Sequence, residues 1–293
     1  MHMTVKTKLI FAYIALGIYV LISLFPFVWS GLIAFTPVNF VDEQGNKQGV
    51  DIMEWPPEFK LFPLRFFGAP PTLESFAKVF EITPFARWIL NTLLYAGLVT
   101  IGHLVLDSLG GYAFARLKFP LKNFWFLLFL STLMIPGHVT LIPVYNLMVN
   151  MDFINTYWGL FLPKLTGVFG LFLMRQFFMG IPHSLEEAAK MDGASIPRRF
   201  FTIILPISRP AMAALGIYIF LGTWNDFLWP LLITSQKEMY TLTAGLNFFR
   251  SSYYTIWQYM MAASLMITLP MVAVFLGAQK YFVESGAASG VKG

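Results

Sequence analysis

Long apolar runs separated by short polar segments dominate the chain. Six runs have the length of a membrane span, at residues 9–35, 88–115, 124–148, 157–179, 210–234 and 260–283. A helix that crosses a bilayer needs roughly 20 mostly apolar residues. The pattern therefore predicts an all-α polytopic membrane protein with six transmembrane helices, and an even number of spans places both termini on the same side.

Composition agrees with this pattern. Of the 293 residues, 57% are hydrophobic and only 12% are charged, about half the charged share of a soluble domain. The first apolar run is longer than the apolar core of a signal peptide, so we expect it to be retained as a span. The chain has no cysteine, which excludes disulfides, cysteine metal sites and a cysteine nucleophile.

Basic residues collect on one set of the short connections. That set holds Lys6, Lys8, Arg116, Lys118, Lys122, Lys190, Arg198, Arg199, Arg209, Lys280 and Lys292. The opposite short connections hold none at 149–156 and only Lys237 and Arg250 at 235–259. Because Lys and Arg accumulate on the cytoplasmic side, we expect cytoplasmic N and C termini and a cytoplasmic 180–209 loop.

These runs define the expected organisation. Residues 1–35 form the N-terminus and first span, and residues 36–87 an extracytoplasmic segment. Residues 88–283 form the core membrane domain with five spans and the 180–209 loop, and 284–293 a cytoplasmic tail. Pro56-Pro57 and Pro70-Pro71 in the outer segment favour loops and short helices.

Proline interrupts several predicted spans. The positions are Pro136-Gly137, Pro143, Pro163, Pro230 and Pro270. Non-helical backbone at membrane depth is tolerated where it lines a cavity or lies within protein. Breaks along a translocation path and plain kinks in passive helices both fit this pattern.

The 180–209 loop carries a short polar segment with helix signals. Ser184 to Glu187 has the Ser-x-x-Glu form of a capping box. Asp192-Gly193 suits a helix end, and Ser195-Ile196-Pro197 suits the start of a second short helix. On physical grounds alone, a helix lying on the membrane surface and a helix offered to a partner protein remain open.

The full spacing of this loop resembles a known signature. Glu187-Ala188-Ala189, three residues, Gly193, nine residues, then Ile203-x-Leu205-Pro206 is similar to the loop of permease subunits of binding-protein-dependent ABC importers. Further segments resemble the carbohydrate-uptake branch of that family: Asn91-Thr92-Leu93, Gly111 to Arg116, Met134-Ile135-Pro136, Pro143-x-Tyr145, Trp224 to Leu231, Gln279 to Val283 and Gly290 to Gly293.

This resemblance implies a type I importer permease fold, and the smaller six-span partner of a maltose-type permease heterodimer. The implied partners are a second permease subunit, two cytoplasmic ABC ATPases, an extracytoplasmic solute-binding protein, a sugar and the lipid of a prokaryotic inner membrane, with no nucleic acid. ATP and Mg would be bound by the ATPases and no cofactor by this chain, which is then a transport subunit and not an enzyme.

The resemblance also assigns roles within the loop. A short coupling helix around Glu187 would sit in a groove of an ATPase subunit and pass its motion to the spans. The implied coupling residues are Glu186, Glu187, Ala188, Ala189, Asp192, Gly193, Leu205 and Pro206. No catalytic residue or metal ligand is implied.

Ionisable residues inside spans are functional candidates because burying them in lipid is costly. His103 and Asp107 are four residues apart and share a helix face, so they can form a structural pair or belong to a transport path. Lys164 can likewise pair with a carboxylate or face the path. Both alternatives stay open for each.

The fifth span carries a set of side chains suited to sugars. Trp224 and Trp229 offer aromatic faces, and Asn225 and Asp226 offer groups that bond hydroxyls. These four residues are the candidate substrate path, although aromatic residues are also enriched at membrane interfaces. The outer connection from Thr241 to Trp257, with Tyr253-Tyr254, would by resemblance reach the outer cavity and the solute-binding protein; a plain interfacial helix is the alternative.

The sequence predicts an ATP-driven importer of a di- or oligosaccharide by alternating access. A polyol or glycerol-phosphate importer is the alternative, and an ion-driven secondary transporter using Asp107, Asp226 or Lys164 is a more distant one. A membrane enzyme has no support, since the four His lack a metal-ligand spacing and neither a phosphate loop nor a serine nucleophile motif appears. The chain does not identify its sugar or the share of the binding site that a companion permease carries.

Overall fold

The computed structural model describes residues 5–41, 47–50, 52, 59–61, 64–250 and 255–290. Three predicted features, the Pro56-Pro57 turn, the Tyr253-Tyr254 pair and the last residues of the tail (291–293), lie outside the described residues. The chain divides into two compact units, Met1–Phe85 with Leu246–Leu269 and Ala86–Gly245 with Pro270–Gly293. Each unit is described by itself.

Three helices are long and apolar enough to cross a membrane as they stand. They are α1 (Val5–Ala34), α3 (Phe85–Arg116) and α14 (Trp257–Gly290), the last with a span at Trp257–Gly277. The most apolar 18-residue window of α1 has no residue buried within the protein, and only the C-terminal end of the helix is packed. A helix that is hydrophobic all round needs an apolar surrounding, which here is lipid.

Three further candidates are bent pairs of helical segments. The first joins α4 (Lys122–Ser131) and η1 (Thr132–Met134) to α5 (Gly137–Asn150) at 100°. The second joins α6 (Tyr157–Phe161) and η2 (Leu162–Lys164) to α7 (Val168–Met179) at 45°. The third joins α9 (Ile196–Arg199), η3 (Phe200–Ile204, a π-helical turn) and α10 (Leu205–Ile207) to α11 (Arg209–Trp224) at 77°. The helical membrane fold is confirmed, with six spans if each bent pair is one span.

The breaks fall only partly where proline predicts them. The bend at Pro136-Gly137 is confirmed. Pro143 and Pro270 lie inside continuous helices, so a break at either is wrong. The predicted fifth span is interrupted after Trp224, and the chain resumes as α12 (Leu228–Ile233) with Pro230 inside it.

The first unit contains two short antiparallel hairpins that the sequence did not predict. The strands are β1 (Asn39–Val41) with β2 (Lys47–Gly49), and β3 (Phe59–Leu61) with β4 (Leu64–Phe66). One short helix, α2 (Glu74–Ile82), and the turn η5 (Leu246–Phe249) belong to the same unit. A small core of Ile33, Ile52 and Phe67 packs the hairpin region against the end of α1, where Trp29 meets the Phe67 ring edge-on at 5.5 Å.

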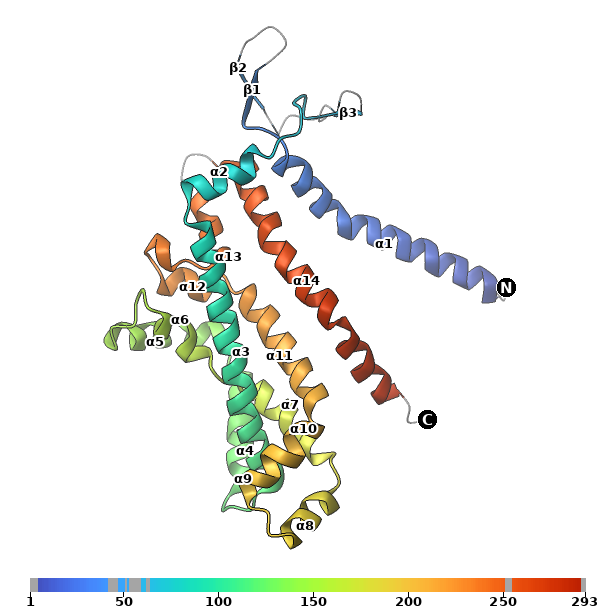
Figure 1. The fold of residues 1–293 in the computed structure, drawn as a ribbon, viewed down its shortest axis with the longest axis vertical. Helices are drawn as coiled ribbons and strands as arrows, with labels where there is room; N and C mark the ends of the chain where they lie inside the picture. Colours follow the sequence, from blue (N-terminus) through green and yellow to red (C-terminus); the bar gives the residue numbers. More distant parts are fainter. Residues whose placement is uncertain are drawn as a thin grey trace. The chain divides into compact units, whose positions relative to one another are not determined.

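Two apolar cores lie along α3 in the second unit. Near the C-terminal end of α3, Tyr112 packs with α7, η3 and α11 around Met174, Phe178, Ile204 and Leu215. Towards its N-terminal end, Tyr95 and Val99 pack with α5, α6 and α12 around Met148, Leu160, Trp229 and Ile233. The remaining elements are α8 (His183–Met191), η4 (Lys237–Met239) and α13 (Leu242–Gly245). In Figure 1, α8, α9 and α10 gather at the C-terminal end of α3, and α5, α6, α12 and α13 at the other end.

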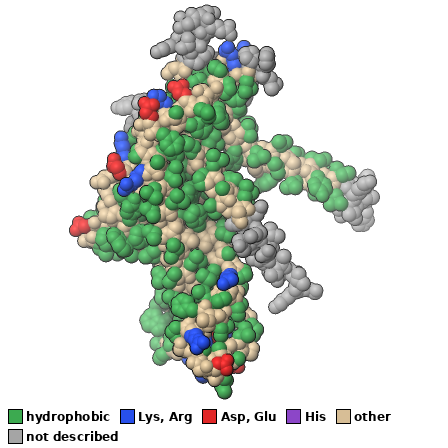
Figure 2. Space-filling view, viewed as in Figure 1, with side chains coloured by type: hydrophobic (Ala, Val, Ile, Leu, Met, Phe, Trp, Pro, Cys, Tyr) green, Lys and Arg blue, Asp and Glu red, His purple; other side chains and the backbone are tan. Residues whose placement is uncertain are grey.

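Hydrophobic side chains are spread over the whole face seen in Figure 2, and charged side chains are few. A soluble protein seldom exposes apolar patches larger than a few hundred Å². The surface is therefore that of a protein embedded in lipid or covered by other apolar subunits.

Candidate functional site

The short helix α8 is the centre of the predicted coupling loop. Its N-cap is Pro182, whose extended backbone precedes the helix and which forms no side-chain cap. Ser184 already lies in the first turn, so the predicted capping box from Ser184 to Glu187 is wrong. The helix therefore begins two residues earlier than a box capped by Ser184 would require.

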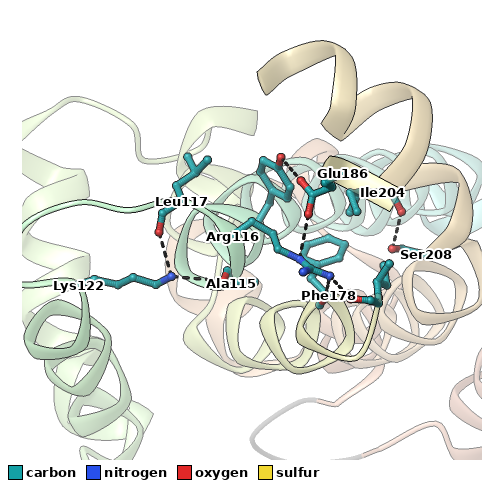
Figure 3. A network of polar contacts seen from close by, with 10 residues as sticks. Ala115, Arg116, Leu117, Lys122, Phe178, Glu186, Ile204 and Ser208 are labelled. Atoms are coloured by element: carbon teal, nitrogen blue, oxygen red, sulfur yellow. Dashed lines mark hydrogen bonds and ion pairs between the residues drawn. The ribbon is translucent and has the colours of Figure 1, made fainter. Parts of the chain in front are cut away.

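Glu186 is buried and faces the protein interior. Only 6% of the residue is exposed. Its Oε1 accepts a hydrogen bond of 2.7 Å from the Tyr112 hydroxyl, and its Oε2 lies 3.1 Å from Arg116 Nε. Tyr112 and Arg116 are one helical turn apart on α3, so together they form a two-point receptor for one carboxylate. Figure 3 shows Arg116 extended between Glu186 and the backbone near Phe178.

The same arginine also joins α8 to the end of the preceding helix. Arg116 donates to the backbone carbonyls of Phe178, in the last turn of α7, and of Ile181, which follows that helix. The approach of α7 to α3 depends on Gly111, where a Cβ would lie 2.8 Å from Met174 Cβ and 2.9 Å from a backbone nitrogen. Close helix contact and a buried ion pair therefore fix this end of the protein.

Basic side chains also satisfy the last carbonyls of α3. Lys122 donates to Ala115 and Leu117 at 3.3 and 2.9 Å, as Figure 3 shows. Arg175 donates to Phe114 at 3.3 Å and lies 4.0 Å above the Phe126 ring. Helix C-termini leave carbonyls without intrahelical partners, and cations are favoured there.

Gly193 ends α8 as the sequence predicts. It adopts a φ of +79°, and its N–H donates to Lys190 while the Ala194 N–H donates to Ala189, at 3.0 and 2.9 Å. These two bonds form a Schellman motif, which turns the chain sharply at a left-handed residue. The second short helix also begins where predicted, with Ser195 as N-cap of α9 and Pro197 in its first turn.

The predicted coupling residues separate into three groups by exposure. Glu187, Ala188, Asp192, Gly193 and Pro206 are exposed, Ala189 and Leu205 are half-buried, and Glu186 is buried. The exposed group is accompanied by apolar side chains that face outward, with Met191 at 87% and Leu185 at 43% exposed. The outward face of α8 is therefore partly acidic and partly apolar, while Glu186 on its inward face holds the helix to α3.

The predicted substrate-path residues do not share one environment. Trp224 is 1% exposed, and its indole N–H has no acceptor among the described residues. Trp229 is 2% exposed and donates to the carbonyls of Gly159 and Leu160, both at 3.1 Å. Trp229 therefore holds α12 to α6 and presents no face to a ligand in this conformation. Asn225 is exposed, and its amide donates to Leu221.

Asp226 is the member of this set that reaches a cavity. It lies in the break between α11 and α12, and its Oδ2 accepts from Tyr95 at 2.7 Å and from Lys164 at 3.0 Å. Its backbone carbonyl accepts from Thr243 at 2.6 Å. Lys164 therefore has a carboxylate partner, one of the alternatives that the sequence left open.

The second membrane pair is more deeply buried. His103 Nδ1 lies 2.6 Å from Asp107 Oδ2, and Asp107 is fully buried. Asp107 Oδ1 accepts from the Thr166 hydroxyl at 2.6 Å and the Gly167 N–H at 3.2 Å. The pairing of His103 with Asp107 is confirmed, and it also fastens the break that precedes α7.

Three residues with a large part in this geometry were not among the predicted site residues. Tyr112 appeared only within the family-like segment ending α3, Arg116 only there and among the basic residues of the short connections, and Tyr95 was not singled out. A polar pair spaced by four residues at the end of an apolar helix was the available signal for the first two. Tyr95 offers no such signal, because its partner is 131 positions further along the chain.

The described residues thus form a helical membrane protein whose short helix α8 is fixed to α3 by a buried carboxylate. The family comparison agrees: residues 108–285 match the model of the binding-protein-dependent transport system inner membrane component. The chain belongs to this family, and it is a multi-pass membrane permease of the ABC transporter class.

Named relatives cover nearly the whole chain. It is 34% identical over 283 residues to the sn-glycerol-3-phosphate transport system permease protein UgpE of Yersinia pestis, covering 94% of each chain. It is 35% identical over 207 residues to the arabinooligosaccharides transport system permease protein AraQ of Bacillus subtilis, covering 71% of this chain and 74% of the relative.

The fold has a counterpart among solved structures. A chain from the crystal structure of a bacterial ABC transporter involved in the import of the acidic polysaccharide alginate superposes with a TM-score of 0.78 at 20% identity, covering 96% of this chain and 99% of that one. At this level of identity the likeness shows the fold.

Proposed function

We propose that this chain is one permease subunit of an ATP-driven importer that takes up a di- or oligosaccharide delivered by a solute-binding protein. It would pair with a second permease, cross the membrane six times with cytoplasmic termini, and bind one of two ATPase subunits through α8. The observation that carries the proposal is that two adjacent acidic residues of α8 face opposite environments. Glu186 is buried on Tyr112 and Arg116, and Glu187 is exposed beside it.

The buried contact of Glu186 with Tyr112 and Arg116 explains how a helix of nine residues could transmit force. An isolated helix of this length is marginal in water, so α8 needs tertiary contacts to be rigid. A buried ion pair supplies such a contact, because breaking it leaves a buried charge without a partner. The outward face then has an acid, small alanines and Met191, which suits a groove with basic and apolar walls.

The relatives divide on substrate, since one named group carries sn-glycerol-3-phosphate and the other arabinooligosaccharides. The polyol or glycerol-phosphate importer is therefore the second candidate. Family membership favours ATP as the energy source over an ion gradient.

A charge reversal on the exposed acid tests the proposal. We expect Glu187→Lys to abolish ATP-dependent uptake and substrate-stimulated ATPase activity in proteoliposomes, while the permease remains folded and assembled with its companion. Glu238→Lys is the matched control, since Glu238 is also exposed and lies on the opposite set of connections. Stimulated ATPase activity that survives Glu187→Lys would show that α8 does not couple the subunits, and uptake driven by an ion gradient without ATP would contradict the proposal as a whole.

A further inference from the structure

A cavity of about 320 Å³ lies beside the break between α11 and α12. α3 contributes His103, η2 contributes Lys164, α11 contributes Tyr218 and Thr223, and the break contributes Asp226. Val99, Ile219 and Gly222 complete the wall. All of these residues belong to the second compact unit. Of the predicted substrate-path residues, only Asp226 lines this cavity.

Polar groups in the cavity wall retain unused hydrogen-bonding capacity. Both side-chain contacts of Asp226 fall on Oδ2, which leaves Oδ1 without a partner among the described residues. Lys164 donates one hydrogen bond to Asp226 through one of its three N–H groups, and its side chain is 43% exposed. Among the described residues, the His103 ring has a hydrogen-bond partner at Nδ1 and none at Nε2.

The hydroxyls and the aromatic surface add to this set. Within the described part of the chain, neither the Tyr218 nor the Thr223 hydroxyl has a hydrogen-bond partner. The Tyr218 ring packs against Phe169 at 5.0 Å and is 58% exposed. The wall thus combines donors, acceptors and an aromatic face within one small cavity.

Lys164 and Asp226, both in the cavity wall, form an ion pair with 3.0 Å between Nζ and Oδ2. A phosphate or carboxylate ligand would have to compete with Asp226 for Lys164, and two anions would then share one cation. Like charges at such separations repel strongly in a low dielectric. A hydroxyl ligand avoids this conflict, because it can accept from Lys164 and donate to Asp226 without breaking the pair.

We infer that this cavity is a binding subsite for a neutral, hydroxyl-rich ligand, a sugar unit in transit, and that this subunit itself contacts the cargo through Lys164, Asp226, Thr223 and Tyr218. The inference rests on the proposed function and narrows it, because it assigns a share of the binding site to this chain and disfavours an anionic cargo.

The absence of cysteine in the chain allows a direct test by single-cysteine labelling. Thr223→Cys and Tyr218→Cys introduce thiols into the cavity wall, and Gln236→Cys introduces a control thiol at an exposed position outside it. The full complex in proteoliposomes is treated with a water-soluble thiol reagent in the presence of arabinotriose as the neutral probe or sn-glycerol 3-phosphate as the anionic probe. Uptake of both probes is measured in parallel.

We expect arabinotriose to slow labelling of both cavity thiols several-fold, without affecting the Gln236→Cys control, and sn-glycerol 3-phosphate to have no effect. Protection by the anion alone would overturn the assigned ligand class. Unchanged labelling in a complex that still imports arabinotriose with ATP would overturn the subsite and leave the proposed function intact. Import without ATP would overturn the proposed function instead.

A conservative variant gives a second measurement if a cysteine variant fails to fold. Thr223→Val keeps the shape and removes one hydroxyl, so we expect KM for arabinotriose to rise roughly 2- to 10-fold with the maximal rate retained. Thr223→Ser should restore the original KM. An unchanged KM for Thr223→Val would count against a hydroxyl contact at this position.

Discussion

The buried ion pair between Arg116 and Glu186 is expected to be the main fastening of α8. Both side chains are nearly inaccessible, with 2% and 7% of their surface exposed, so solvent screens their interaction little. Removing one partner of such a pair typically costs about 3–5 kcal/mol, because the other charge stays buried and uncompensated. We therefore expect Arg116→Met and Glu186→Gln each to lower the unfolding midpoint of the purified complex by roughly 6–20 °C.

The double variant separates a true pair from two independent defects. Arg116→Met with Glu186→Gln removes both charges, and the glutamine introduced at position 186 can still accept from the Tyr112 hydroxyl. We expect the double variant to lose less unfolding free energy than the sum of the two single losses, by about 2–3 kcal/mol. Thermal unfolding is followed by tryptophan fluorescence, for which the chain has 8 Trp residues.

The exposed neighbour is the control for this cycle. Glu187→Gln should change stability by less than about 0.5 kcal/mol, because its side chain is exposed. Equal losses for Glu186→Gln and Glu187→Gln, or strictly additive losses in the double variant, would refute the assignment of Glu186 as the anchor.

Two glycines provide further tests by the same thermal measurement. At Gly170 a Cβ would lie 1.9 Å from the buried Asp107 Oδ2, so Gly170→Ala should destabilise the protein by about 1–3 kcal/mol. Gly97→Ala is the control: a Cβ there meets nothing within 4 Å, so this change should be neutral or slightly stabilising. At Gly193 the φ of +79° predicts a loss of about 1–2 kcal/mol for Gly193→Ala and a smaller one for Gly193→Asn, since Asn tolerates this conformation; equal losses for Ala and Asn would contradict the strain argument.

The sequence predicts the membrane fold well because lipid imposes a simple rule on each span. Apolar length alone locates α1, α3 and α14, and Pro136-Gly137 locates one bend. Proline is a poorer guide elsewhere. Pro270 removes one backbone donor from α14, yet the helix continues, as transmembrane helices commonly do when the freed carbonyl finds another partner.

The break after Trp224 could not be predicted from local signals. No proline lies between Trp224 and Leu228, and the non-helical backbone is held by residues from distant segments. Tyr95 and Lys164 donate hydrogen bonds to the Asp226 carboxylate, and the Thr243 hydroxyl donates to its backbone carbonyl. Such a break depends on tertiary partners, which single-sequence patterns do not contain.

In the predicted coupling loop, local sequence patterns again do not identify a tertiary contact, here that of a single residue. The turn at Asp192-Gly193 is local chemistry, and it is predicted correctly. Which of two neighbouring acids faces inward depends on a receptor that includes Tyr112, 74 positions earlier in the chain than Glu186. Helical periodicity places Glu186 and Glu187 about 100° apart, but it does not say which direction is the interior.

The long helix α3 connects the proposed coupling helix α8 with the proposed sugar subsite. Tyr112 and Arg116 near one end hold Glu186 of α8, while Tyr95 holds Asp226 at the break beside the cavity. At about 1.5 Å per residue, Tyr95 and Tyr112 are about 25 Å apart along the helix axis. A displacement of α8 must therefore either carry this end of α3 with it or separate a buried ion pair, at about 3–5 kcal/mol. Since the apolar core around Tyr112 also joins α3 to α7 and α11, moving these helices together is the less costly response, and both α3 and α11 contribute residues to the wall of the cavity.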